Sequence, residues 1–247
     1  MVQRECGQPQ GFLLVIRCIP SHFRAAFLLA LPGVCFRITR LDPKNLMVTF
    51  ADTPNRSTYC ELARQPLDAD QCALIVIDIQ EKLLPPIFER ERLVRNSQLL
   101  IRAARILKIP TLLSTQYAKG LGPTVPAIAS LLPDTDAIDK TLFSCFASDV
   151  FCSVIEGLPS QRNTLLLCGM ESHICVMQTA LGALRAGHLV HVASDAVSSR
   201  TEWNWKVGLD RMRAAGAIIS STEMMIYELM RSSSSAAFKE LLPYLKG

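Results

Sequence analysis

The sequence lacks an apolar run of the about 18–20 residues that a membrane-spanning helix needs. The nearest run, residues 25–36, is about a dozen residues long and is interrupted by Pro32 and Gly33. The apolar stretch at residues 11–16 stops at Arg17, which does not fit a secretory signal. We therefore expect no membrane partner for this chain.

Cysteines at metal-ligand spacing are also absent. The nine cysteines are scattered and form no C-x-x-C pair, which excludes zinc-ribbon and thioredoxin-like sites. Cys72 and Cys168 lie in apolar stretches, where a free cysteine fills core space as a small hydrophobic side chain. We expect a reducing compartment without disulfides and place the protein in the cytoplasm. Residues 1–40, rich in Arg and poor in acidic residues, leave organellar targeting as the alternative.

The sequence has no concentrated basic region of the kind that nucleic-acid binding requires. Its formal net charge is +4, and residues 1–66 carry eight Lys/Arg against four Asp/Glu. The whole chain has 26 Lys/Arg and 22 Asp/Glu, so residues 67–247 contain 18 basic and 18 acidic residues and have no formal net charge. We expect no nucleic acid partner.

The residue pattern changes near Pro66. Before it, apolar and polar residues mix without a clear period, and prolines interrupt the chain. We expect residues 1–66 to be a poorly ordered N-terminal extension or a region translated from a mis-called start. A targeting segment and a true appendage are the alternatives. After Pro66, short aliphatic runs alternate with longer amphipathic stretches, which is typical of a parallel α/β domain, here residues 67–247.

Six short aliphatic runs predict strands at residues 73–78, 110–115, 136–140, 163–169, 188–194 and 217–220. Helices are predicted near residues 90–107, 123–132, 147–157, 173–186, 203–215, 222–231 and 235–245. Runs as apolar as ALIVI and TLLLC indicate burial on both faces of the sheet, so helices must cover both faces. The sequence predicts a Rossmann-like, three-layer α/β/α sandwich around a six-stranded parallel sheet.

Polar side chains follow three of the predicted strands. Asp78 ends the first strand, with Gln80 two residues on, and Lys140 ends the third. Cys175 follows the fourth strand, at the start of a predicted helix. Because ligands bind beyond the carboxyl ends of parallel strands, we expect a carboxylate, an amine and a thiol at one edge of the sheet.

These three groups can perform acyl transfer together. A free thiol has a pKa of about 8.5, which a helix start or a nearby cation lowers. Asp78 can take the proton of Cys175 as a general base and later pass it to a leaving group. Lys140 can keep Asp78 ionised and favour the thiolate. Free amides at the helix start can face an oxyanion.

Five segments in order resemble the isochorismatase-like (cysteine) hydrolase superfamily. The segments are LIVIDIQEKLL (74–84), STQYAKGLGPTVPAI (114–128), DKTLFSCF (139–146), GMESHICVMQTA (169–180) and SDAVSSR (194–200). The resemblance covers roughly residues 70–245 and is similar in particular to the metal-free branch of isochorismatase domain-containing proteins. Residues 1–66 have no counterpart in it.

The resemblance implies a catalytic triad of Asp78, Lys140 and Cys175. It also implies a cis peptide between Met170 and Glu171, and an oxyanion hole formed by the amides of Glu171 and Cys175. The strand order that it implies is 3-2-1-4-5-6, which places the first and fourth strands side by side. A homo-oligomer of at least two copies is expected on the same basis.

The chain departs from metal-dependent members of the family. Nicotinamidases carry an Asp/His metal cluster after the second strand, whereas this chain reads STQYAKGLG there, without histidine. We therefore expect no metal and no other cofactor. Isochorismate hydrolases can lack the cysteine, so Cys175 favours hydrolysis of a small amide or related C–N compound through a thioester. A vinyl-ether hydrolase without covalent catalysis and an inactive binding or assembly module remain the alternatives.

Each candidate residue also has a structural interpretation. Cys175 alone could fill core space, Asp78 could cap a helix, and Lys140 could lie on the surface. His173 is two residues from Cys175, and positions i and i+2 of a helix point to different sides, so we expect it at the rim. The remaining residues predicted to line a small-molecule pocket are Gln80, Tyr117, Lys119, Leu121 and Phe143, and packing is the alternative for the apolar ones.

Overall fold

The computed structural model describes residues 14–17, 35–42, 45–51 and 64–246. The chain divides into two units, Met1–Tyr59 and Cys60–Gly247. The first unit contains β1 (Leu14–Arg17), β2 (Cys35–Asp42) and β3 (Asn45–Ala51), which pair antiparallel in the order β1-β3-β2.

These three strands differ from the low order expected for residues 1–66. The signal for them is in the sequence, because Phe36 and Ile38 alternate with polar residues in β2 over a short range. The interrupting prolines hide this pattern when residues 1–66 are considered as a whole. For the rest of residues 1–66, most of which lie outside the described residues, the expectation of low order stays a prediction.

The second unit is built on a six-stranded, all-parallel sheet in the order β6-β5-β4-β7-β8-β9. Counted within this unit the order is 3-2-1-4-5-6, which confirms the prediction. The strands are β4 (Cys72–Ile77), β5 (Thr111–Gln116), β6 (Ala137–Lys140), β7 (Thr164–Met170), β8 (Leu189–Ser198) and β9 (Ile218–Ser220). β8 is longer than predicted because, after an irregularity in its pairing, it pairs again with the end of β7.

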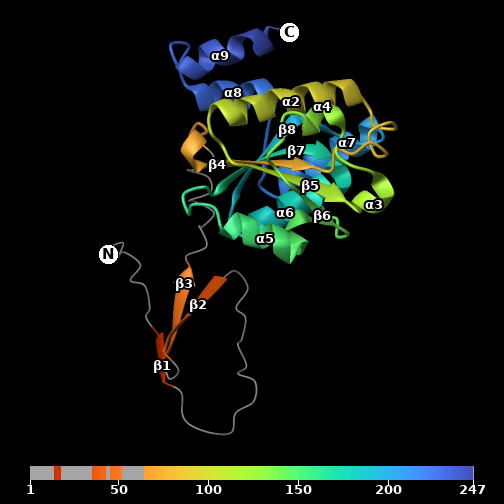
Figure 1. The fold of residues 1–247 in the computed structure, drawn as a ribbon. Coiled ribbons are helices and arrows are strands. Elements are labelled where there is room, and N and C mark those ends of the chain that lie inside the picture. Colours follow the sequence, from red (N-terminus) through yellow and green to blue (C-terminus); the bar gives the residue numbers. More distant parts are fainter. Residues whose placement is uncertain (1–13, 18–34, 43–44, 52–63, 247) are drawn as a thin grey trace, which may run out of the picture. The chain divides into compact units, whose positions relative to one another are not determined.

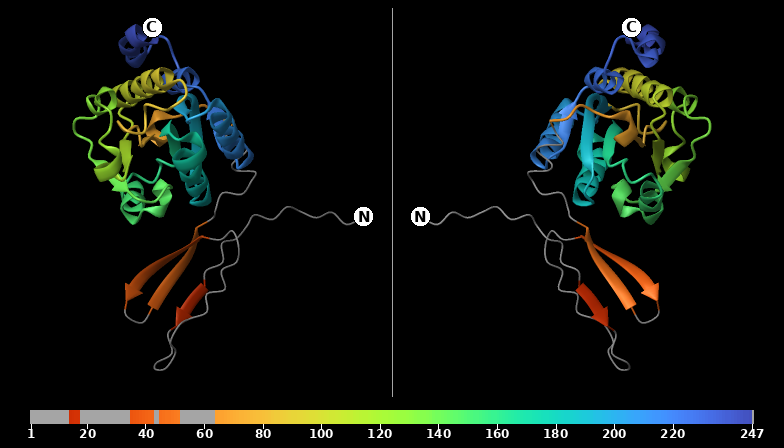
Figure 2. Two further views of the ribbon diagram at one scale, coloured as in Figure 1. Left: turned by 90° about the vertical axis from the view of Figure 1, so that its right-hand side faces the viewer. Right: turned by 90° about the vertical axis from the view of Figure 1, so that its left-hand side faces the viewer.

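Helices cover both faces of this sheet, as Figures 1 and 2 show. One layer contains α2 (Arg90–Ile106), α4 (Pro126–Ala129), α8 (Thr222–Met230) and α9 (Ala236–Leu245). The other contains α5 (Asp149–Glu156), α6 (Met177–Arg185) and α7 (Glu202–Ala214). The predicted three-layer sandwich is confirmed. The helix predicted at residues 123–132 is reduced to α4, which begins at Pro126.

The central strand β4 is buried along its whole length. Leu74 and Val76 point into the core beneath α2, whereas Ile75 and Ile77 point into the core beneath α5 and α6. Each of these side chains contributes roughly 1.5–3 kcal/mol by burial. This rigid strand fixes the position of the residue that follows it, Asp78. Within residues 64–246 no helix has the length and apolar character to cross a membrane.

Candidate active site

The carboxyl ends of four neighbouring strands bring the predicted triad together. Asp78 directly follows β4, and Lys140 is the last residue of β6. Cys175 lies in a π-helical turn, Ser172–Val176, which connects β7 to α6. β5 lies between β4 and β6, so Lys140 reaches across its end to Asp78.

Asp78 and Lys140 form a buried ion pair. The Nζ atom of Lys140 donates to Oδ2 of Asp78 at 2.7 Å, and the two side chains are 1% and 0% exposed. Ser114 donates its hydroxyl to Oδ1 of Asp78 at 2.8 Å, and Lys140 also donates to Oε1 of Gln116 at 2.9 Å. Both carboxylate oxygens are therefore held, and the pair is fixed by two side chains of β5.

The backbone at Asp78 adopts a left-handed conformation with φ 51°. Asp and Asn occupy this region more readily than most residues, although at some cost in strain. The Asp78 amide donates to the carbonyl of Ser114 at 3.1 Å, which anchors the turn to β5. The turn sends the chain away from the sheet while the carboxylate stays at its edge.

Cys175 lies against this pair, with only 7% of the residue exposed. Burial raises the pKa of its thiol above the ordinary value. The nearby carboxylate of Asp78 raises this pKa further, and Lys140 lowers it. Lys140 therefore acts on the thiol in the expected direction, but burial and the carboxylate outweigh it, so a thiolate is disfavoured in the resting site.

The end of β7 approaches β4 very closely at Gly169. This residue has φ +121°, and a Cβ atom there would overlap the backbone of Ile77. Glycine is therefore required at this point for β4 and β7 to lie side by side. The peptide between Met170 and Glu171 is cis, at the position that the family resemblance implies.

Glu171 lies at the rim of the site. Its carboxylate accepts hydrogen bonds from Nε of Arg200 at 2.9 Å and from the Arg200 amide at 3.3 Å. Its carbonyl accepts from the amides of Ile174 and Val176, which ties the π-helical turn to the cis peptide. The turn that carries Cys175 is therefore held at its start by Glu171.

The five predicted pocket residues differ in their surroundings. Gln80 is completely buried, and its side-chain amide bonds to Gln116 and to the carbonyl of Gly122. It therefore fixes the loop after β5 and leaves no free group for a substrate. Tyr117 and Phe143 are 50% and 53% exposed, Lys119 is exposed and Leu121 is partly buried. Their contact with a substrate stays a prediction.

Three side chains of the site were missed from the sequence. Ser114 and Gln116 are two apart in β5 and thus lie on one face, a period that could have shown them next to Asp78. Cys145 was missed because nothing in its spacing relates it to β5. Its Sγ donates to Oγ of Ser114 at 3.7 Å, and burial raises the pKa of its thiol.

His173 is directed away from the triad. Its Nδ1 lies 2.9 Å from Oγ of Ser199, which in turn contacts Oγ of Ser172 at 2.6 Å. Burial lowers the pKa of His173. Residues 64–246 contain no group of three or more His, Cys, Asp or Glu side chains arranged to hold a metal ion.

The fold and this site define a three-layer α/β/α protein with a buried carboxylate, amine and thiol at the carboxyl edge of its parallel sheet. Residues 72–224 match the model of the isochorismatase domain. The chain belongs to the isochorismatase family of hydrolases.

Individual proteins agree with this assignment. The chain is 38% identical over 176 residues to the secreted isochorismatase effector Isc1 of Phytophthora sojae, covering 70% of this chain and 83% of that protein. It is 39% identical over 171 residues to isochorismatase domain-containing protein 2 of Danio rerio, covering 68% and 83%. The solved structure of MAR1 ribonuclease from Caenorhabditis elegans superposes with a TM-score of 0.69 at 36% identity, covering 74% and 93%.

Proposed function

We propose that this chain is a cysteine-dependent hydrolase of a small amide or a related C–N compound. The observation that supports this most directly is the buried Asp78–Lys140 ion pair, 2.7 Å long, with the Cys175 thiol close enough for both charges to shift its pKa. A nucleophile in contact with a base, and the base in turn held by a third group, is the arrangement that covalent catalysis needs. No metal or cofactor takes part.

In the first half-reaction, Sγ of Cys175 attacks the carbonyl carbon of the substrate while its proton passes to Asp78. The C–N bond then breaks, and the amine leaves with the proton from Asp78, so that a thioester remains on Cys175. In the second half-reaction, water attacks the thioester and Asp78 takes its proton. The acid leaves, and the proton returns to the sulfur.

Proton transfer in this scheme accompanies attack and does not precede it. Burial and the adjacent carboxylate raise the pKa of Cys175, so a stable thiolate is disfavoured before substrate binds. Lys140 offsets the negative charge that Asp78 and the sulfur share. The amides of Glu171 and Cys175 are assigned to the oxyanion, and each such donor is typically worth about 2.7–4 kcal/mol in the transition state.

The direct test is release of amine or ammonia from a panel of small aliphatic and aromatic amides. Wild type should turn over at least one member, while Cys175→Ala and Asp78→Asn lose turnover. Cys152→Ala is the matched control, because Cys152 is a partly buried cysteine on α5, outside the site, and should leave turnover unchanged. Full turnover of an amide by Cys175→Ala would contradict the covalent mechanism. Hydrolysis of a vinyl ether by wild type and Cys175→Ala alike, without turnover of any amide, would favour a vinyl-ether hydrolase, which the name of Isc1 also suggests.

Two further outcomes are distinguishable in the same preparations. The similar C. elegans protein is named a ribonuclease, so cleavage of an RNA oligonucleotide is the second candidate activity. If Cys175→Ala still cleaves RNA, the Cys175 thiol takes no part in that activity. Absence of any turnover, together with slow thiol alkylation, would favour a binding or assembly module.

We also propose that the protein is a cytoplasmic homo-oligomer with a small-molecule substrate. Trp203 on α7 and Val150 on α5 are 74% and 63% exposed, and apolar side chains of this kind are suited to an interface between copies. The cysteines of residues 64–246 are all free, which suits a reducing compartment. Light scattering after size-exclusion chromatography tests the assembly, and a single-copy mass would contradict it.

A further inference from the structure

A cavity of about 850 Å³ lies at the edge of the sheet opposite the catalytic residues. Thr164 and Leu189, the first residues of β7 and β8, form part of its wall. β7 runs from Thr164 to Met170, and at about 3.3 Å per residue the two ends of the strand are roughly 20 Å apart. The volume is within the range of about 300–1,000 Å³ that small-molecule sites occupy. The catalytic scheme leaves this cavity unused.

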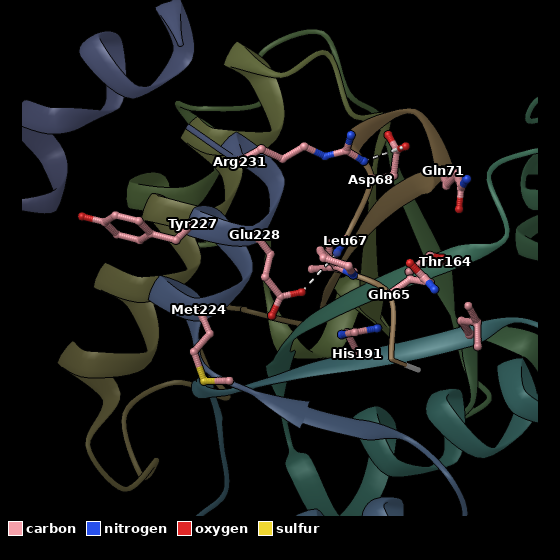
Figure 3. Close-up of a pocket in the computed structure, with 12 residues that line it drawn as sticks. Gln65, Leu67, Asp68, Gln71, Thr164, His191, Met224, Tyr227, Glu228 and Arg231 are labelled. Carbon is pink, nitrogen blue, oxygen red and sulfur yellow. Dashed lines mark hydrogen bonds and ion pairs between the residues drawn. The ribbon is translucent and has the colours of Figure 1, made fainter. Parts of the chain in front are cut away.

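His191 provides a buried polar group in this cavity. It lies on β8 with 7% of the residue exposed, and Figure 3 shows its ring between Glu228 and the start of β7. Within the described residues its ring nitrogens have no hydrogen-bond partner. Burial lowers the pKa of His191 to about 4, so the ring is neutral at pH 7 and offers one donor and one acceptor. The ring is therefore a neutral polar group on the wall of the cavity.

The side chains that line the cavity include two acidic residues, Asp68 and Glu228, and one basic residue, Arg231. Arg231 donates to Oδ2 of Asp68 at 2.9 Å, so these two neutralise each other at the rim (Figure 3). Glu228 accepts from the Leu67 amide through Oε2 at 3.1 Å, and its other oxygen has no partner among residues 64–246. Among the side chains that line the cavity, Glu228 is thus a carboxylate without an ion-pair partner in residues 64–246, and it lies beside a neutral imidazole.

Apolar side chains complete the wall. Leu67 and Leu189 are buried, and Met224 lies at the mouth, with 55% of the residue exposed. We propose that this cavity is a second ligand site, which binds a small organic cation. The expected ligand has a protonated amine attached to a compact apolar or aromatic group. The ammonium group pairs with Glu228, His191 provides a hydrogen bond, and the apolar body covers the two leucines. An anion of the same size would meet the Glu228 carboxylate and is disfavoured.

The test is NMR titration of the His191 imidazole signal of the full chain, assigned with a His191→Gln variant. Three probes of matched shape are used: benzylammonium, benzyl alcohol and benzoate. Benzylammonium should shift the signal saturably, at concentrations about tenfold lower than the other two. Equal responses to benzylammonium and benzoate, or no saturable shift by benzylammonium, would overturn the proposal.

Variants locate the site without disturbing the core. Met224→Arg adds a positive charge at the exposed mouth and should weaken benzylammonium binding about tenfold, whereas Met224→Glu should not weaken it. Glu228→Gln keeps an acceptor for the Leu67 amide and should weaken binding to a similar degree. Cys175→Ala should bind as wild type does. Loss of binding in Cys175→Ala, or equal binding by the two Met224 variants, would place the ligand elsewhere and contradict the assignment.

Discussion

Replacing Lys140 with methionine removes one partner of the buried ion pair and should destabilise the fold strongly. Two unit charges 2.7 Å apart attract by roughly 6 kcal/mol at an effective dielectric constant of about 20. Much of this attraction offsets the cost of taking both charges out of water. Lys140→Met leaves the Asp78 carboxylate buried with only Ser114 as a side-chain partner, so we expect a loss of about 3–5 kcal/mol in the free energy of unfolding.

Urea unfolding followed by circular dichroism measures this loss. The double variant Asp78→Asn, Lys140→Met removes both charges and should cost about 2 kcal/mol less than the sum of the two single variants. Lys119→Met, at an exposed position in the short helix α3 (Ala118–Leu121) after β5, is the control and should change stability by less than about 0.5 kcal/mol. A Lys140→Met protein within about 1 kcal/mol of wild type would refute the reasoning, because the pair would then be solvated or absent.

Three further predictions concern single groups. Because burial and Asp78 raise the pKa of Cys175, iodoacetamide should alkylate this thiol more slowly at pH 7 than it alkylates a free model thiol. Asp78→Asn should speed the alkylation. Alkylation of wild-type Cys175 faster than that of the model thiol would contradict the prediction. The pKa of His191 is lowered from 6.5 to about 4, so its stabilising contribution is complete above pH 6.5 and is lost as the pH falls through 4. Between pH 7 and 4 wild type should therefore lose about 3 kcal/mol more unfolding free energy than His191→Gln, and parallel curves would show that the ring is solvated. Gly169→Ala should lower the free energy of unfolding by at least about 2 kcal/mol, because the added Cβ overlaps β4. Gly216 also has a positive φ, +107°, but has open space around it, so Gly216→Ala should lower the free energy of unfolding by only about 1 kcal/mol. Equal losses of stability in thermal unfolding would show that the overlap is not the cause.

The fold of residues 67–247 could be predicted because its signals are local and repeated. The aliphatic runs that form β4 and β7 are buried along their whole length, and each predicted strand is followed by an amphipathic stretch. Helix ends were less predictable, since tertiary contacts decide them. The segment after β7 is one example, where a π-helical turn replaces the first turn of the expected helix. The strands of residues 1–66 were missed because their alternation extends over only a few residues.

The three central site residues could be placed at one edge of the sheet because each follows a strand. Their exact partners could not be predicted. Cys145 meets Ser114 through a turn, Cys145–Ala147, whose path depends on the packing of α6, and the Cys145 amide donates to Thr179 of that helix. The protonated resting state of Cys175 also depends on burial, which appears only when the layers are assembled. Gln80 was expected in the pocket because the sequence does not show that the β5 loop closes around its amide.

The most direct test of the central claim is intact-mass spectrometry of the enzyme, acid-quenched during turnover of a small amide, followed by peptide mapping. The proposed mechanism predicts a mass increase equal to the acyl group, located on the peptide that contains Cys175 and absent from Cys175→Ala. Turnover at full rate with no adduct in wild type, and equal turnover by Cys175→Ala, would contradict it.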